Sequence, residues 1–254
     1  MFFVKLFFHT LGRLSNGIDL CIKEGLTSGK MLDYIYEKRA SGKWIIGKWI
    51  DQMFLSHPGW EAVRIRRQNL EFLLKEAIST RQTPLKLVDI ASGPASYILS
   101  VIKKEKQVEA ICRDLDTRWL EEGARKAQSE GIKNVLFEKG DAFDRKAMIS
   151  LKPHIVVSSG FYDWINEDVQ IQKSIEMIFE ALPSNGAFIL SIQTSHPNQA
   201  LVQKIFTDFN HNPLKMTMRS VGDVSTWLKT TGFCVEKALS DPKGYYSVIK
   251  ARKP

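Results

Sequence analysis

From residue 85 onward, short apolar runs alternate with segments of helical periodicity, and this alternation constrains the fold more than any other feature. Short apolar runs bounded by turn residues predict buried strands, and strands that alternate with helices predict βαβ units and a mostly parallel sheet. The predicted strands are 85–90, 108–114, 134–140, 154–159, 186–193, 232–239 and 245–251. The predicted helices between them are 97–104, 118–130, 169–181, 197–209 and 221–230.

The last two predicted strands differ from the others because only a short turn, SDPKG at 240–244, joins them. A connection of this length pairs two strands antiparallel, since a parallel pair needs a long crossover. We therefore expect an α/β, Rossmann-like, doubly wound fold. Its seven-stranded, mostly parallel sheet would end in a C-terminal antiparallel hairpin.

Residues 1–80 carry a different pattern, and we predict that they form a helical cap or lid beside a sheet domain at 81–254. The stretches 29–55 and 61–78 have helical spacing. The apolar residues 1–14 are interrupted by Lys5 and are too few to cross a bilayer, which takes about 20 residues. We expect residues 1–14 to form an amphipathic helix that packs on the protein, with peripheral contact to a membrane surface as the alternative.

Charge and cysteine content narrow the class of protein. Lys and Arg number 36 against 28 Asp and Glu, which gives a net charge of +8, but no run of five like charges occurs. This scatter favours a solvated basic surface over a nucleic-acid footprint. Three cysteines that are far apart, Cys21, Cys112 and Cys234, argue against a disulfide framework and a zinc site. We expect a cytoplasmic protein with reduced thiols and no metal, and the oligomeric state stays open.

The stretch LVDIASGPASYIL at 87–99 ends a predicted strand on Asp89 and continues in small residues, 91–96. Small residues let the backbone approach a ligand closely, and doubly wound sheets bind ligands beyond the carboxyl ends of their strands. Taken alone, the stretch is equally typical of a plain tight turn. Its one glycine lacks the spacing of a dinucleotide-binding loop, which argues against an NAD-dependent dehydrogenase.

Two further predicted strands end in acids at positions that suit a nucleoside. Asp114 closes the second strand, 21 residues after Gly93, where a carboxylate can accept hydrogen bonds from ribose hydroxyls. Asp116 is available to cap the next helix, which leaves Asp114 free. Asp141 closes the third strand, where it can accept from an adenine amino group while residues 142–143 pack on the ring. Each acid alone is also typical of a turn, but the three strand ends together predict a ligand site.

In this order, VDIASGPASYI, ICRDLDTRWLEEGARKA and EKGDAFD resemble the first three motifs of class I S-adenosylmethionine (SAM)-dependent methyltransferases. That resemblance covers residues 60–254. The segments SSGFYDW and QTSHP, together with EGLTSGKMLDYIYEKRASGK near the N-terminus, are similar to one bacterial methyltransferase family that is often linked to α/β-hydrolases. The closer similarity covers nearly the whole chain.

The resemblance implies a SAM-dependent methyltransferase that releases S-adenosylhomocysteine (SAH). The aromatic residues of the predicted cap favour a small acceptor of apolar, aromatic or lipid-like character. Ala91 and Ala95 stand where many class I enzymes have glycine, and alanine disfavours a positive φ, which leaves room for weaker cofactor affinity. The residues implied to bind the cofactor are Asp89, Ala91, Ser92, Gly93, Pro94, Asp114, Leu115, Asp141, Ala142, Phe143, Ser159 and Gly160.

The loops after the fourth and fifth strands supply the candidates for catalysis. Tyr162 is a candidate wall or hydrogen-bond donor for the acceptor, and His196 a candidate base; packing and loop roles are the alternatives. One arginine of three is a candidate partner for the cofactor carboxylate: Arg64, Arg66 or Arg67. Four aromatic residues of the cap either close over the substrate or pack in the core: Tyr34, Tyr36, Trp44 and Trp49.

Two other functions stay as alternatives to a small-molecule methyltransferase. The net charge of +8 fits an RNA methyltransferase, but the chain lacks an NPPY-type motif after the fourth strand and an appended RNA-binding module. The alanines of the loop fit a non-catalytic SAM-binding or scaffold protein. The three acids Asp89, Asp114 and Asp141 argue against that alternative.

Overall fold

The structure, a computed structural model, describes residues 2–80, 84–208 and 210–254, with side chains in the first helix described from residue 5. The chain divides into two units. The first comprises Met1–Ile65 and His196–Met216, and the second comprises Arg66–Ser195 and Thr217–Pro254. The domain boundary that we predict between residues 80 and 81 adjoins residues 81–83, which lie outside the described residues.

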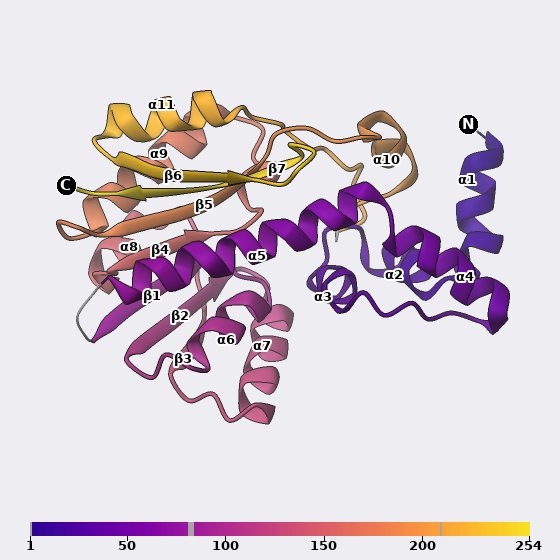
Figure 1. The fold of residues 1–254 in the computed structure, drawn as a ribbon, viewed down its shortest axis with the longest axis horizontal. Helices are drawn as coiled ribbons and strands as arrows, with labels where there is room; N and C mark the ends of the chain where they lie inside the picture. The colour runs from indigo at the N-terminus through magenta and orange to yellow at the C-terminus, as the bar shows by residue number, and fades with distance from the viewer. Residues whose placement is uncertain (1, 81–83, 209) are drawn as a thin grey trace. The chain divides into compact units, whose positions relative to one another are not determined.

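The second unit contains a seven-stranded sheet in the order β3-β2-β1-β4-β5-β7-β6 (Figure 1). Strands β1 to β5 run parallel, whereas β7 pairs antiparallel with both β5 and β6. The order reverses between β1 and β4, which is the switch point of a doubly wound sheet. The predicted fold is therefore confirmed, including the C-terminal hairpin. The strands are β1 Leu85–Ile90, β2 Val108–Asp114, β3 Val135–Lys139, β4 Ile155–Ser158, β5 Ala187–Gln193, β6 Cys234–Ser240 and β7 Tyr246–Arg252.

Helices cover both faces of this sheet, and α5 lies in front of the strands in Figure 1. Neighbouring strand residues point to opposite faces. Leu87 packs in a core with Leu70 of α5 and Ile98 of α6, whereas Val88 packs in a second core with Ile175 of α9. The helices of this unit are α6 Ser96–Ile102, α7 Thr117–Ser129, α8 Arg145–Leu151, α9 Asp168–Ala181, the 3₁₀ turn η2 Tyr162–Trp164, α11 Val221–Thr231, and the part of α5 Pro58–Ser79 from Arg66 onward.

Most of these helices match the predicted ranges, and local chemistry explains their ends. Asp116 accepts a hydrogen bond from the backbone N–H of Arg118 and so caps α7, as predicted. Helix α8 was not predicted because its seven residues are too few for a clear helical period. The predicted helix 197–209 is shorter in the structure, and residue 209 lies outside the described residues.

The first unit is built around one buried carboxylate, that of Asp51. It accepts hydrogen bonds from the Ser15 hydroxyl (2.5 Å), the Gly17 N–H (2.8 Å), the Ser41 N–H (2.9 Å) and the Tyr34 hydroxyl. These donors lie in three segments, at residues 15–17, 34 and 41, and Asp51 joins them. The elements are α1 Phe2–His9, η1 Leu11–Leu14, α2 Asn16–Glu24, α3 Gly29–Glu37, α4 Trp44–Leu55, the beginning of α5, and α10 Gln199–Ile205.

The helical stretch predicted at 29–55 is two helices, α3 and α4, because Lys38 adopts a left-handed conformation that ends α3. Within residues 1–14, α1 is followed by the 3₁₀ helix η1. The Phe8 ring packs edge-on against Phe206, with 5.4 Å between centroids, so this segment packs within the first unit.

Candidate cofactor and active site

The loop between β1 and α6 has an unusual backbone. Ala91, Gly93 and Ala95 all have a positive φ, of 50°, 56° and 53°. An alanine in this left-handed region costs about 1 kcal/mol, whereas glycine adopts it freely. The Ser92 N–H donates to the Arg113 carbonyl (2.9 Å), so the loop is tied to the end of β2. Strain of this kind persists where the surrounding structure fixes it, and it is concentrated at ligand sites.

Asp114 holds the same loop with its side chain. One carboxylate oxygen accepts from the Gly93 N–H at 2.8 Å, and the other accepts from the Asp116 N–H at 2.9 Å. A Cβ added at Gly93 would meet no heavy atom within 4 Å, so the far side of the loop is open. Two residues that are 21 positions apart in the sequence thus meet beside an open surface at the carboxyl edge of the sheet.

Asp89 lies within the protein and not on this open surface. Its side chain is fully buried at the end of β1. Burial raises the pKa of its carboxyl well above the ordinary value, and the nearby Asp114 carboxylate raises it further. The Tyr97 hydroxyl acts in the opposite direction by hydrogen bonding. The structure therefore places Asp89 within the protein, near the end of β1 and just before this loop.

The end of β3 joins this edge through the backbone and presents apolar side chains. The Gly140 N–H donates to the Asp114 carbonyl at 3.0 Å, and Asp141 accepts from the Phe143 N–H at 2.9 Å. Leu115 is 62% exposed and Phe143 is 37% exposed. Large apolar side chains that stand open beside polar groups are typical of a site that binds a planar apolar ligand. Ala142, by contrast, is buried in the core.

The segment after β4 is held by hydrogen bonds to β5 and to α9. The Gly160 N–H donates to the Ser191 hydroxyl at 2.8 Å, and the half-buried Ser159 precedes it. The Tyr162 side chain is 1% exposed, and its hydroxyl lies 2.9 Å from the Ser174 hydroxyl. Burial raises the pKa of Tyr162. The structure thus places the phenol of Tyr162 in the core between β4 and α9.

Next to Tyr162, Asp163 is a buried carboxylate with mixed surroundings. It accepts from the Gln193 N–H at 2.7 Å, and its other oxygen lies 3.7 Å from an Arg66 nitrogen. Burial raises the pKa of Asp163 to about 6, although the Arg66 and Arg219 guanidinium groups oppose the shift. Arg66, one of the three predicted cofactor arginines, therefore packs against the loop after β4.

Two residues of this region were missed in the sequence. Arg219 is buried and donates to the Tyr162 and Ile165 carbonyls, at 2.8 and 2.6 Å, and to the Asp168 carboxylate at 2.8 Å. Arg219 thereby holds the segment from Tyr162 to Asp168 in place. Gln193, at the end of β5, has a buried amide nitrogen with no hydrogen bond among the described residues. A buried donor of this kind is a common position for a ligand contact. No sequence signal distinguishes either residue.

The other predicted residues belong to the first unit. His196 accepts from the Asn198 N–H at 3.1 Å, and burial, with a smaller effect of His57, lowers the pKa of His196 to about 4. Its imidazole is therefore uncharged near neutral pH but weakly basic. Arg64 donates to the Ile35 and Leu55 carbonyls, at 3.4 and 3.2 Å.

The remaining predicted cap residues have structural partners or face outward. Tyr34 bonds Asp51, and burial raises the pKa of Tyr34 to about 12. Arg67, in the second unit, pairs with Glu71 at 2.7 Å. Trp44 and Trp49 are exposed. Among the described residues, no group of three or more His, Cys, Asp or Glu is arranged to hold a metal ion.

Comparison with known proteins covers nearly the whole chain. A family model described as "Putative methyltransferase" matches residues 2–253. A protein from Escherichia coli (strain K12), named "Uncharacterized protein YnbC", is 27% identical over 98% of this chain. The match takes up 44% of that protein, so the chain spans less than half the length of this relative.

Solved structures share the fold at low sequence identity. A protein from Bordetella parapertussis, described as a possible exported protein, superposes with a TM-score of 0.74 at 18% identity, covering 94% of this chain and 83% of that one. Magnesium protoporphyrin IX methyltransferase from Synechocystis PCC 6803, crystallised with SAH, gives a TM-score of 0.62 at 13% identity. That superposition covers 91% of this chain and 98% of the other.

Proposed function

The chain belongs to the family described as "Putative methyltransferase", and from this premise we propose that it transfers a methyl group from SAM to a small organic acceptor. The observation that carries the proposal is the tie between Asp114 and Gly93 beside an open surface. Asp114 keeps unused lone pairs on both oxygens, so it can accept from two ribose hydroxyls without releasing the loop. A structural neighbour of the same fold was crystallised with SAH, which supports this choice of cofactor.

The other residues of the edge fit the rest of such a cofactor. Leu115 and Phe143 offer exposed apolar surface for the two faces of an adenine ring. Asp141 uses one oxygen for the Phe143 N–H, which leaves the other for the adenine amino group. Gly93 and the small residues beside it let the backbone approach the nucleoside closely. We assign Asp89 a supporting role beneath the loop, since its carboxyl is buried.

When bound, SAM supplies a methyl group on a positively charged sulfur with a good leaving group. The protein must then align the acceptor and exclude water, and a base is needed only for a poor nucleophile. Phe161 and the partly exposed Trp164 follow β4 and favour an apolar or aromatic acceptor. We propose that Tyr162 acts through the position of this segment, because Ser174 already engages its hydroxyl.

The test is a calorimetric titration of the full chain with SAM and with SAH, followed by a screen of acceptors by release of SAH. Micromolar binding of both supports the proposal. Absence of binding by folded protein rejects the cofactor site. A screen in which only small polar acceptors are methylated keeps the methyltransferase and rejects the apolar acceptor.

A further inference from the structure

Helix α4 presents most of its large apolar side chains to solvent. Gly47, Asp51 and Leu55 form its buried side, which is spaced at i, i+4 and i+8. A helix at the surface of a soluble protein normally has the reverse arrangement, with apolar residues inward and polar residues outward. The exposed residues form what we call the α4 face: Trp44 (78% exposed), Ile45 (88%), Ile46 (61%), Trp49 (63%) and Met53 (58%).

The inward side of α4 is fixed, so the helix cannot turn to bury this face. A Cβ added at Gly47 would lie 2.3 Å from the Leu14 carbonyl oxygen, so the backbones of α4 and η1 are in direct contact at this position. Asp51 binds Ser15, Gly17, Ser41 and Tyr34. Turning the helix would break these bonds and leave a carboxylate buried without partners, which is costly.

The first residue of the helix is held in a strained conformation. Trp44 has a φ of 56°, and a bulky side chain rarely adopts this left-handed region. The Trp44 side chain is mostly exposed, so its contacts within the protein do little to offset this backbone strain. Strain at an exposed tryptophan is consistent with a residue shaped for an external contact.

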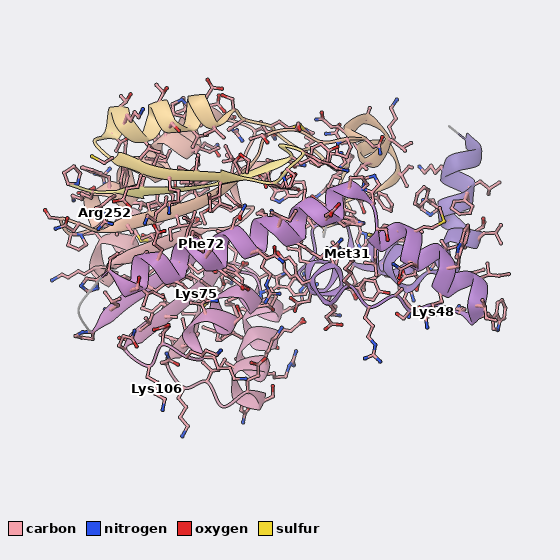
Figure 2. All side chains as sticks on the ribbon, in the orientation of Figure 1. Met31, Lys48, Phe72, Lys75, Lys106 and Arg252 are labelled. Atoms are coloured by element: carbon pink, nitrogen blue, oxygen red, sulfur yellow. The ribbon has the colours of Figure 1, made fainter. Side chains whose placement is uncertain are left out.

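The charged residues in the segment that carries the outward side of α4 all have one sign. Residues 38–50 contain four basic residues and no acid, and the single acid of α4, Asp51, points inward. None of the four makes an ion pair within the described parts of the chain, and all are exposed: Lys38, Arg39, Lys43 and Lys48. Lys48 is labelled in Figure 2. An apolar surface with a purely basic border is complementary to an anionic one.

We propose that the α4 face docks on the surface of an anionic lipid bilayer. Tryptophan is favoured at the level of the lipid headgroups, aliphatic side chains can enter the acyl boundary, and each nearby lysine adds attraction to anionic lipid. No helix in the described ranges is long and apolar enough to cross a bilayer, so the contact is interfacial. This inference does not rest on methyl transfer.

A second copy of the chain fits this surface less well. A symmetric dimer through the α4 face brings the same patch of each copy together, so the basic border of one copy would face that of the other. Like charges opposed across an interface disfavour association. The border therefore favours lipid headgroups, whose phosphates are negative, over another α4 face.

The experiment is co-sedimentation of the full chain with vesicles of phosphatidylglycerol and phosphatidylcholine, and with vesicles of phosphatidylcholine alone. We expect binding to the anionic vesicles that weakens as salt rises. The variant Ile45→Glu and the double variant Lys43→Glu/Lys48→Glu should each lose roughly tenfold or more in partitioning. Controls on the second unit, Val169→Glu and Lys229→Glu, also change exposed residues and should bind as the wild type does.

Four results would overturn the proposal. They are failure of the folded wild type to bind anionic vesicles, equal binding to neutral vesicles, equal loss in the control variants, and a wild-type dimer in sedimentation that Ile45→Glu dissociates. The last result would assign the face to a second copy. Because the changed side chains are exposed, each variant should unfold at the same temperature as the wild type. Thermal unfolding measures this and separates a loss of binding from a loss of fold.

Discussion

The carboxylate of Asp114 accepts a hydrogen bond from the backbone N–H of Gly93 at a distance of 2.8 Å. This bond joins the end of β2 to the loop that follows β1. The other oxygen of the carboxylate accepts a hydrogen bond from the Asp116 N–H. The residue proposed to bind the ribose is therefore also the residue that shapes the cofactor loop. Changes at Asp114 should affect binding and stability together.

Replacement of Asp114 by Asn tests this double role. An amide has one acceptor oxygen, so one of the two backbone N–H groups loses its partner, at a cost of about 1–3 kcal/mol in the free energy of unfolding. We also expect SAM affinity to fall by roughly tenfold or more, equivalent to about 1.4 kcal/mol or more. Urea denaturation and calorimetric titration measure the two effects. Glu109→Gln, on the exposed part of the same strand, should change neither, and full affinity in Asp114→Asn would refute the ribose role.

Gly93 and Gly131 form a matched pair for the open side of the loop. Both have a positive φ, 56° and 69°, and an added Cβ at either meets no heavy atom within 4 Å. Gly93→Ala and Gly131→Ala should therefore lose similar stability, about 1 kcal/mol each from backbone strain. Only Gly93→Ala should weaken SAM binding, since its Cβ would occupy space assigned to the cofactor. Equal affinities in the two variants would mean that the cofactor does not contact the loop.

The exposed apolar side chains at the edge of the sheet give a third test. Phe143→Ala and Leu115→Ala remove surface proposed to contact adenine, and each should reduce SAM affinity several-fold. Their stability should change little, because both side chains are partly open to solvent. Leu136, which is 51% exposed on β3, serves as the control when changed to Ala. If Leu136→Ala lowers the affinity as much as Phe143→Ala, the adenine position is wrong.

The fold was predictable because its signals are local. Each strand lies within two residues of its predicted range; Asp114 ends β2 as expected, and Asp141 follows the end of β3 by two residues. A parallel sheet brings the carboxyl ends of its strands to one edge, so their position in the sequence was enough to group them. The hydrogen bonds that the Gly93 and Gly140 N–H groups donate to Asp114 hold these strand ends together.

The remainder depends on contacts between distant residues. Arg219 binds the Tyr162 carbonyl across 57 positions, and Asp51 joins three segments to α4, but neither leaves a periodic pattern. The apolar spacing of α4 correctly indicates a helix yet does not say which side faces inward. That direction is decided by Gly47 and Asp51, whose partners in η1 and α3 appear only in the structure. Likewise, the sequence places Tyr162 in a loop and does not indicate that its side chain is buried.

The last prediction concerns pH, and its sign follows from Asp163. Burial raises the pKa of this carboxyl to about 6 in the folded protein, above its ordinary value of 3.8. Between these two values the folded state binds a proton that the unfolded state has lost, so the contribution of Asp163 to stability decreases as pH rises from about 4 to 6. The difference between these two pKa values corresponds to a loss on the order of 3 kcal/mol. In urea denaturation, the wild type should thus lose stability relative to Asp163→Asn over this range and run parallel to it above pH 7. The opposite slope would mean that the Arg66 and Arg219 guanidinium groups outweigh burial and hold the carboxylate charged.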